Sequence, residues 1–187
     1  QVFELPTFEQ VGEWHHNTTP MNQQIRILQG INKHIYDTIM EQDASASPQI
    51  FYSMENNTIG EAALLRVMDI GEENIQGMFL SEPIRKGHRR KFRRGFNTTA
   101  KFKIDACTKF KELIEGGKMK INSQLLISEL KDFVASGLSF KAKPGQHDDL
   151  VSACLLMTRM MKVLADFDPK IFEKWTVRTS ELTPMPI

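Results

Sequence analysis

DDLVSACLLMTRMMKVLA, residues 148–165, is the longest strongly apolar stretch of the chain. Its leucine, valine, methionine, alanine and cysteine side chains would cover nearly every side of a helix. A helix that is hydrophobic all round is buried in the centre of a domain. We therefore expect the other elements to pack around residues 148–165. The two acids that open the stretch, Asp148 and Asp149, should then lie at the rim of the core.

Upstream of this helix, short apolar segments alternate with amphipathic ones. Thr58, followed three residues later by Glu61, is typical of a capping box at the start of a helix. Alternating strands and helices favour an α/β fold with a mixed sheet flanked by helices. The patterns predict strands at residues 2–5, 8–16, 49–55, 77–80 and 138–142, a brief strand at 120–121, and helices at 21–42, 58–71, 104–115, 123–133 and 148–165.

Composition narrows the class of protein. The chain has 187 residues, of which 41% are hydrophobic and 25% charged, values that fit one globular domain and not a disordered chain. No apolar run approaches the roughly 20 residues that span a bilayer. Cys107 and Cys154 form no CxxC pair, which argues against a disulfide scaffold or zinc ribbon and favours a reducing compartment. The chain has no Walker A loop, GxGxxG or nucleophile motif.

Charge is concentrated in one strip within residues 85–94. The net charge of the chain is +1, but without the strip 17 basic residues face 23 acidic ones, a balance of −6. An acidic body with one dense basic segment predicts a polyanionic partner that touches one place, and a solvated loop is the plainer alternative. The strip consists of Arg85, Lys86, Arg89, Arg90, Lys91, Arg93 and Arg94.

Acids occur at two places where a fold alone does not require them. Glu55 ends a predicted buried strand, and Asp148 and Asp149 begin the buried helix. An exposed strand end and helix capping are the structural alternatives. Carboxylates from different elements suit Mg²⁺ or Mn²⁺, and two such ions can cleave a phosphodiester. His15 and His16 point to opposite faces of a strand, so a zinc site formed by these two with His147 is a weaker alternative.

Two motifs resemble a known family. YSMENNTIGEAAL (residues 52–64) and GQHDDLVSACLLM (residues 145–157) are similar to the nuclease domain of the large terminase subunit of tailed bacteriophages. Residues 95–121 and 125–133 resemble the intervening segments of its myovirus-type branch. The likeness covers roughly residues 2–165.

The resemblance implies an RNase H-like nuclease domain over residues 1–167, a basic hairpin or loop insertion, and a C-terminal tail at 168–187. Glu55 and Asp149 match acids that bind two Mg²⁺ or Mn²⁺ ions in the family, with Asp148 as an auxiliary ligand. The family's first catalytic Asp precedes the first strand expected here, and no residue of this chain matches it. The resemblance therefore predicts weak metal binding and little activity for this chain by itself.

The implied activity is endonucleolytic cutting of concatemeric double-stranded viral DNA during genome packaging. The implied partners are the portal protein and the small terminase subunit, in the host cell cytoplasm and without a membrane. Two alternatives stay open: a Holliday-junction resolvase-like nuclease, which requires a symmetric dimer, and a non-catalytic DNA-binding or assembly module in which the acids only cap helices.

Overall fold

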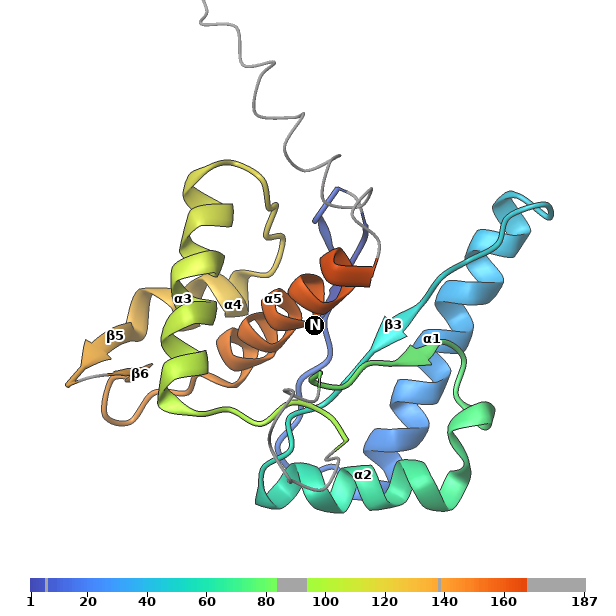
Figure 1. The fold of residues 1–187 in the computed structure, drawn as a ribbon, viewed down its shortest axis with the longest axis horizontal. Coiled ribbons are helices and arrows are strands. Elements are labelled where there is room, and N and C mark those ends of the chain that lie inside the picture. The colour runs from blue at the N-terminus through green and yellow to red at the C-terminus, as the bar shows by residue number, and fades with distance from the viewer. Residues whose placement is uncertain (6, 84–93, 138, 168–187) are drawn as a thin grey trace, which may run out of the picture. The chain divides into compact units, whose positions relative to one another are not determined.

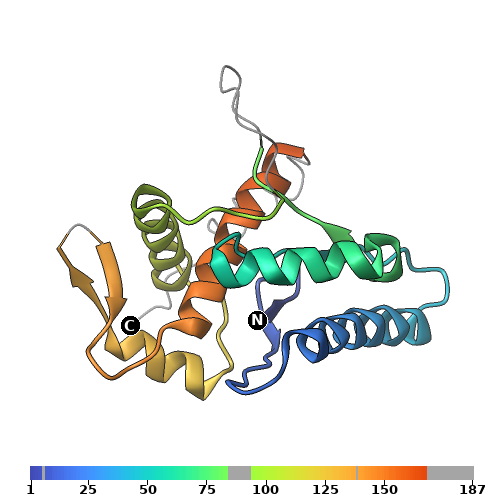
Figure 2. The same cartoon turned by 90° about the horizontal axis from the view of Figure 1, so that it is seen from below.

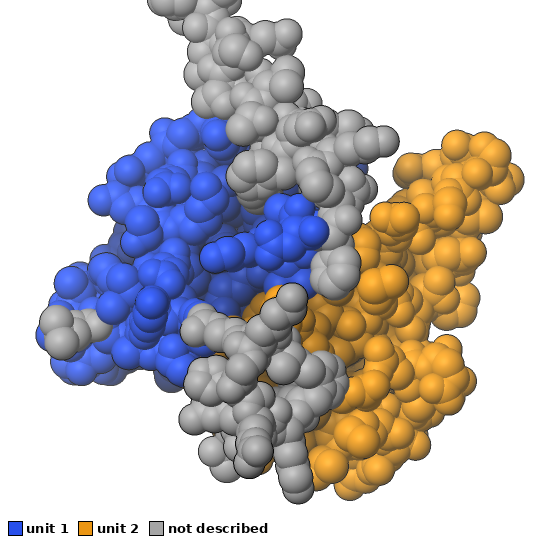
Figure 3. All heavy atoms as spheres, in the orientation of Figure 1, with its two compact units in different colours: residues 1–15, 99–187 blue, residues 16–98 orange. Residues whose placement is uncertain are grey.

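A computed structural model describes residues 1–5, 7–83, 94–137 and 139–167. Helices and short strands give a mixed α/β structure that divides into two compact units (Figure 3). The first unit combines Gln1–His15 with the chain from Thr99 onward, and the second is His16–Thr98. Residues 85–93 of the basic strip and the tail at 168–187 lie outside the described residues. The basic hairpin or loop and the C-terminal tail therefore stay predictions.

Among its described residues, the first unit has two antiparallel strand pairs and three helices, and Figure 1 shows where they lie. Strand β1 pairs with β2, and β5 pairs with β6. Helices α3 and α4 both pack against α5. The elements are β1 (Val2–Phe3), β2 (Gln10–Gly12), α3 (Ala100–Glu115), α4 (Gln124–Asp132), β5 (Phe133–Ser136), β6 (Ser139–Ala142) and α5 (Asp149–Phe167).

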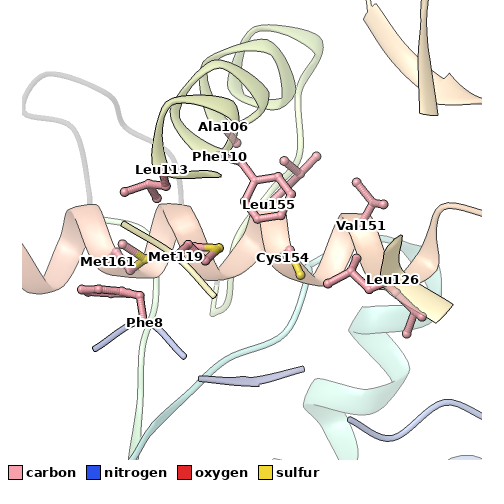
Figure 4. Close-up of a cluster of buried hydrophobic side chains, with 11 residues drawn as sticks. Phe8, Ala106, Phe110, Leu113, Met119, Leu126, Val151, Cys154, Leu155 and Met161 are labelled. Atoms are coloured by element: carbon pink, nitrogen blue, oxygen red, sulfur yellow. The ribbon is translucent and has the colours of Figure 1, made fainter. Parts of the chain in front are cut away.

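Helix α5 forms the centre of the first unit, as its sequence predicts. Val151 and Cys154 are fully buried, and Leu126 of α4 is buried against the same cluster. Figure 4 shows Ala106 and Phe110 of α3 on one side of α5 and Phe8 on the other. Burial raises the pKa of the Cys154 thiol to about 12, so this cysteine is a protonated core residue at neutral pH.

Gln10 ties the N-terminal strands to the start of α4. Its side chain is buried, and its Oε1 atom accepts hydrogen bonds from the backbone of Asn122 and Ser123 at 3.0 and 2.9 Å. The backbone N–H of Gln10 donates to the carbonyl of Lys120 at 2.9 Å. The predicted strand at residues 120–121 is therefore present as a single parallel bridge between Lys120 and Glu9.

The second unit contains a parallel strand pair, β3 with β4, and its helices α1 and α2 lie side by side (Figure 2). Ile25, Tyr52 and Val67 belong to its buried core. The described residues thus contain three two-stranded sheets, while the RNase H-like arrangement stays a prediction. The elements are α1 (Met21–Gln42), β3 (Phe51–Tyr52), α2 (Thr58–Ile70), the 3₁₀ turn η1 (Glu72–Asn74) and β4 (Met78–Phe79).

One edge of the β3 segment receives two chain segments in succession. The N–H of Leu80 donates to the Tyr52 carbonyl at 2.8 Å, and the N–H of Phe96 donates to the Met54 carbonyl at 3.2 Å. Alternate residues of a strand form hydrogen bonds on the same edge. The chain before residues 84–93 and the chain after them therefore follow one another along this edge.

The predicted capping box is wrong. The cap of α2 is Asn57, whose side chain accepts from the N–H of Gly60, and Thr58 is the first helical residue. The helices predicted at 104–115 and 123–133 are present with other bounds. Helix α3 begins at Ala100, and α4 ends at Asp132 because Phe133 begins β5 and stacks on Phe140 of β6. Cross-strand aromatic packing outweighs the helical spacing of Phe133.

None of the described helices is long and apolar enough to cross a membrane.

The phenol of Tyr52 gives a test of the second unit's core. Its ring packs edge-on against Phe79 at 5.3 Å between centroids, but its buried hydroxyl has no hydrogen-bond partner among the described residues. Removing an unpaired buried hydroxyl is neutral or stabilising. We expect Tyr52→Phe to match or exceed the wild type in urea-unfolding free energy at pH 7 by up to about 1 kcal/mol.

The same variant tests the titration of Tyr52. Burial, with a smaller contribution from Glu72, raises the pKa of the phenol to about 12. The protonated phenol therefore favours the folded state, and this stability is lost as the pH rises from about 10 to about 12. Tyr52→Phe should reduce that loss in urea unfolding at a series of pH values. Tyr36→Phe is the control, and an equal effect of both substitutions would contradict this assignment.

Candidate functional site

The start of α5 is capped by a residue from another helix. The first backbone N–H groups of a helix have no partner within it. Here the Glu129 carboxylate of α4 accepts hydrogen bonds from the N–H groups of Leu150 and Val151, at 2.9 and 3.1 Å. The capping role that the sequence offers for Asp148 and Asp149 is thus largely filled by Glu129.

Asp148 immediately precedes α5 and is paired with a cation. Lys103 of α3 places its Nζ atom 3.4 Å from the Asp148 carboxylate, and the two side chains are 21% and 27% exposed. The same ammonium group lies 5.4 Å from the centre of the Phe133 ring. Contact with both a carboxylate and an aromatic face holds Lys103 at this position.

Asp149, the next residue, has a different environment. Its side chain is 66% exposed, and the His15 Nε2 atom lies 3.9 Å from its carboxylate. This separation is too long for a hydrogen bond. The two adjacent acids therefore differ: Asp148 is partly buried and neutralised by Lys103, whereas Asp149 is open to solvent beside an imidazole.

Glu55 lies in the second unit and extends the β3 segment. It forms a parallel bridge with Phe96, and its carboxylate accepts a hydrogen bond from the Asn57 side chain at 3.0 Å. Its half-buried position at a strand end agrees with both the ligand prediction and the exposed strand-end alternative. Glu55 and the two aspartates belong to different units, and each is described within its own.

Gly60 allows α2 to begin against the Glu55 backbone. A Cβ atom at Gly60 would lie 1.6 Å from the Glu55 carbonyl oxygen, far inside van der Waals contact. The Asn57 cap holds the same turn, because its side chain accepts from the Gly60 N–H at 2.8 Å. The ENNTIG sequence thus fixes the backbone on which Glu55 stands.

Arg94 is the member of the basic strip that the structure describes, and it is anchored at two points. Its guanidinium pairs with Glu72, and its carbonyl accepts from the Asn56 side chain at 2.8 Å. Beside it, the N–H of Gly95 donates to the Ser81 hydroxyl at 3.1 Å. DNA binding by Arg94 and by the other six residues stays a prediction.

In the described part of the chain, no three His, Cys, Asp or Glu side chains gather closely enough to hold an ion. Mg²⁺ usually takes only one or two protein carboxylates and completes its shell with water and phosphate. A site for Mg²⁺ or Mn²⁺ at Asp149, like the zinc alternative, therefore stays a prediction. Burial raises the pKa of the nearby Cys107 thiol, which favours its protonated form.

No protein-family model matches the chain.

Sequence analysis missed Glu129, Lys103 and the pairing of His15 with Asp149. Glu129 caps a helix 21 and 22 residues downstream, and no capping motif spans such a distance. Lys103 is one of 24 basic residues and belongs to no motif. His15 and Asp149 are far apart in the sequence and share no motif, so only the fold brings them near one another.

Gly60→Ala should destabilise the second unit strongly. The added methyl group meets backbone, which cannot move as a flexible side chain can. We expect a loss of at least about 2 kcal/mol in urea unfolding. Gly30→Ala is the matched control, because a Cβ at Gly30 in α1 meets nothing within 4 Å and alanine is the better helix former. Equal stability of the two variants would contradict the close approach.

Glu129→Ala should loosen the start of α5, at a cost of about 1–2 kcal/mol. Glu129→Gln retains an acceptor oxygen and should lose less. Hydrogen exchange at the Leu150 and Val151 amides reports the contact directly and should accelerate in Glu129→Ala. Glu112→Ala, an exposed substitution on α3, is the control. Unchanged exchange at both amides would show that Glu129 does not cap α5.

Proposed function

We propose that this chain is the RNase H-like nuclease domain of a phage large terminase, a metal-dependent endonuclease that cuts concatemeric double-stranded viral DNA during packaging. The ENN and HDDLV motifs, in this order and spacing, are the sequence basis of the proposal. Its partners would be the portal protein and the small terminase subunit, in the host cell cytoplasm.

One observation supports this proposal over a purely structural role for the acids. In the non-catalytic alternative, Asp148 and Asp149 exist to cap α5. The N–H groups of Leu150 and Val151 are instead bound by Glu129, while Asp149 is 66% exposed. With its capping role filled by another residue, the exposed Asp149 carboxylate is available to bind a metal ion, which supports the proposal.

The same contacts suggest different roles for the two aspartates. Asp149 would be the principal ligand, because its carboxylate is open to solvent. Asp148 would be an auxiliary group, held and neutralised by Lys103. Glu55 supplies the second carboxylate on the basis of the resemblance. Bound Mg²⁺ or Mn²⁺ supplies an activated water and stabilises the leaving oxygen in phosphodiester cleavage.

The basic strip would hold the DNA backbone without reading its sequence. Lysine and arginine bind phosphates by releasing counterions, which gives affinity without base contacts. In the described part of the chain, Arg94 and Gly95 are fixed to Asn56, Glu72 and Ser81. These contacts would hold the C-terminal end of the strip in place while its other six basic residues bind DNA.

Calorimetric titration with Mn²⁺, combined with a plasmid-nicking assay, tests the proposal. We expect saturable binding to the wild type and a loss of about tenfold or more in affinity in Asp149→Asn and Glu55→Gln. Nicking should be weak, because no residue matches the first catalytic Asp of the family. The exposed acids Glu115 and Asp69 provide controls, and Glu115→Gln and Asp69→Asn should bind Mn²⁺ like the wild type.

Equal Mn²⁺ binding by the wild type and both site variants would contradict the proposal and favour the non-catalytic module. Size-exclusion chromatography separates the remaining alternative, since a stable symmetric dimer would favour a resolvase-like nuclease.

A further inference from the structure

We propose that Arg94 anchors the basic strip and does not itself contact DNA, so that the acid Glu72 is a positioning residue for DNA binding. This inference rests on the proposed function, since it assumes that the strip binds the DNA backbone. It gives a role to Glu72, which belongs to no motif, and it assigns phosphate binding to the other six basic residues of the strip.

The ion pair between Arg94 and Glu72 is partly withdrawn from solvent. The two side chains are 37% and 31% exposed, and the Glu72 Oε2 atom that faces Arg94 is buried. Apart from this ion pair, that oxygen has no partner among the described residues. Moving Arg94 to a phosphate would leave a buried carboxylate oxygen without a compensating charge, which is costly. The guanidinium therefore stays with Glu72 when DNA binds.

The pair also lies close to the core of the second unit. Burial is the main cause that raises the pKa of the Tyr52 phenol, while Glu72 raises it further and Arg94 lowers it. Both charges thus act on a side chain that belongs to the buried core. An arginine whose charge is balanced by an adjacent acid adds little to the net positive charge that displaces counterions from DNA.

The backbone at Arg94 is held in place as well. The buried Asn56 side chain donates to the Arg94 carbonyl at 2.8 Å, and the Asn56 N–H donates to the Phe96 carbonyl at 2.7 Å. A Cβ atom at Gly95 would lie 2.6 Å from the Met54 carbonyl oxygen, so the two backbone segments are in direct contact there. Arg94 therefore begins a segment that is fixed against the chain that continues β3.

The chain just before the strip is joined to the chain at its end. The N–H of Glu82 donates to the Gly95 carbonyl at 3.1 Å, and the N–H of Gly95 donates to the Ser81 hydroxyl at 3.1 Å. Arg94 directly precedes Gly95, so its pairing with Glu72 supports this junction. Without the pair, DNA binding would carry the additional entropic cost of ordering the junction.

Charge exchange tests the anchor. Arg94→Glu places two acids together and should weaken binding to a fluorescently labelled DNA duplex of arbitrary sequence, measured by anisotropy in EDTA. Adding Glu72→Arg restores an ion pair in the opposite direction and should return the affinity to within about threefold of the wild type. Glu73→Arg combined with Arg94→Glu is the matched control. It has the same net charge but alters the exposed neighbouring acid, and it should bind as weakly as Arg94→Glu alone.

Salt dependence provides a second readout. Each phosphate contact contributes about 0.9 to the slope of log affinity against log salt concentration. Arg94→Gln should lower the affinity but keep the wild-type slope, because it removes order and not a phosphate contact. Arg90→Gln, a substitution within the strip, should reduce the slope by about 0.9. Circular dichroism checks the folding of each variant, and Arg94→Gln decides alone where Arg94→Glu does not fold.

The outcomes separate this inference from the proposed function. If Glu72→Arg restores nothing to Arg94→Glu, or if Arg94→Gln reduces the salt slope by about 0.9, Arg94 is a phosphate contact. The anchor inference is then overturned, while DNA binding by the strip stands. If the wild type does not bind the duplex even at low salt, both the anchor and the proposed DNA binding fail.

Discussion

Two hydrogen bonds from the start of α5 to the Glu129 carboxylate determine what the acids of the HDD motif can do. Helix α5 fills the centre of the first unit, so its first N–H groups emerge where water has limited access. A carboxylate there satisfies both groups and complements the positive end of the helix dipole. Because α4 provides this carboxylate, the aspartates beside it are available for other contacts.

In the second unit, the main constraint is the close approach of two backbone segments, at Gly60 and Glu55. The first turn of α2 lies against the Glu55 carbonyl, and glycine at position 60 is what the space allows. Strand β4 pairs with β3, and beyond the end of β4 the N–H of Phe96 donates to the Met54 carbonyl on the same edge. Glu55 therefore occupies a point fixed from both sides, by a helix start and by a neighbouring strand. Arg94 lies two residues before Phe96, which bridges Glu55. The anchored end of the basic strip is therefore close to the Glu55 backbone.

The sequence predicted those elements whose pattern is local. The bounds of α1 match the predicted residues 21–42, and α5 is the buried central helix that its apolar residues indicate. Contacts between distant residues left no comparable signal. Strand β6 confirms the predicted strand at 138–142, but its partner β5 was missed because Phe133 fits a helical pattern until its neighbour Phe140 is considered. The cap of α2 was placed one residue late because Asn57 and Thr58 are both good caps.

The candidate site shows the same limit at the scale of one residue. Asp148 and Asp149 are the same residue type, so nothing in the sequence alone distinguishes their roles. Successive residues at the start of a helix point about 100° apart, so they meet different neighbours. Asp148 meets Lys103 from α3, and Asp149 meets His15, which follows β2. Neither neighbour is close to the acids in the sequence. The motif therefore marks both aspartates as candidate ligands, but the tertiary contacts decide which one is a neutralised, partly buried group and which one is an exposed carboxylate.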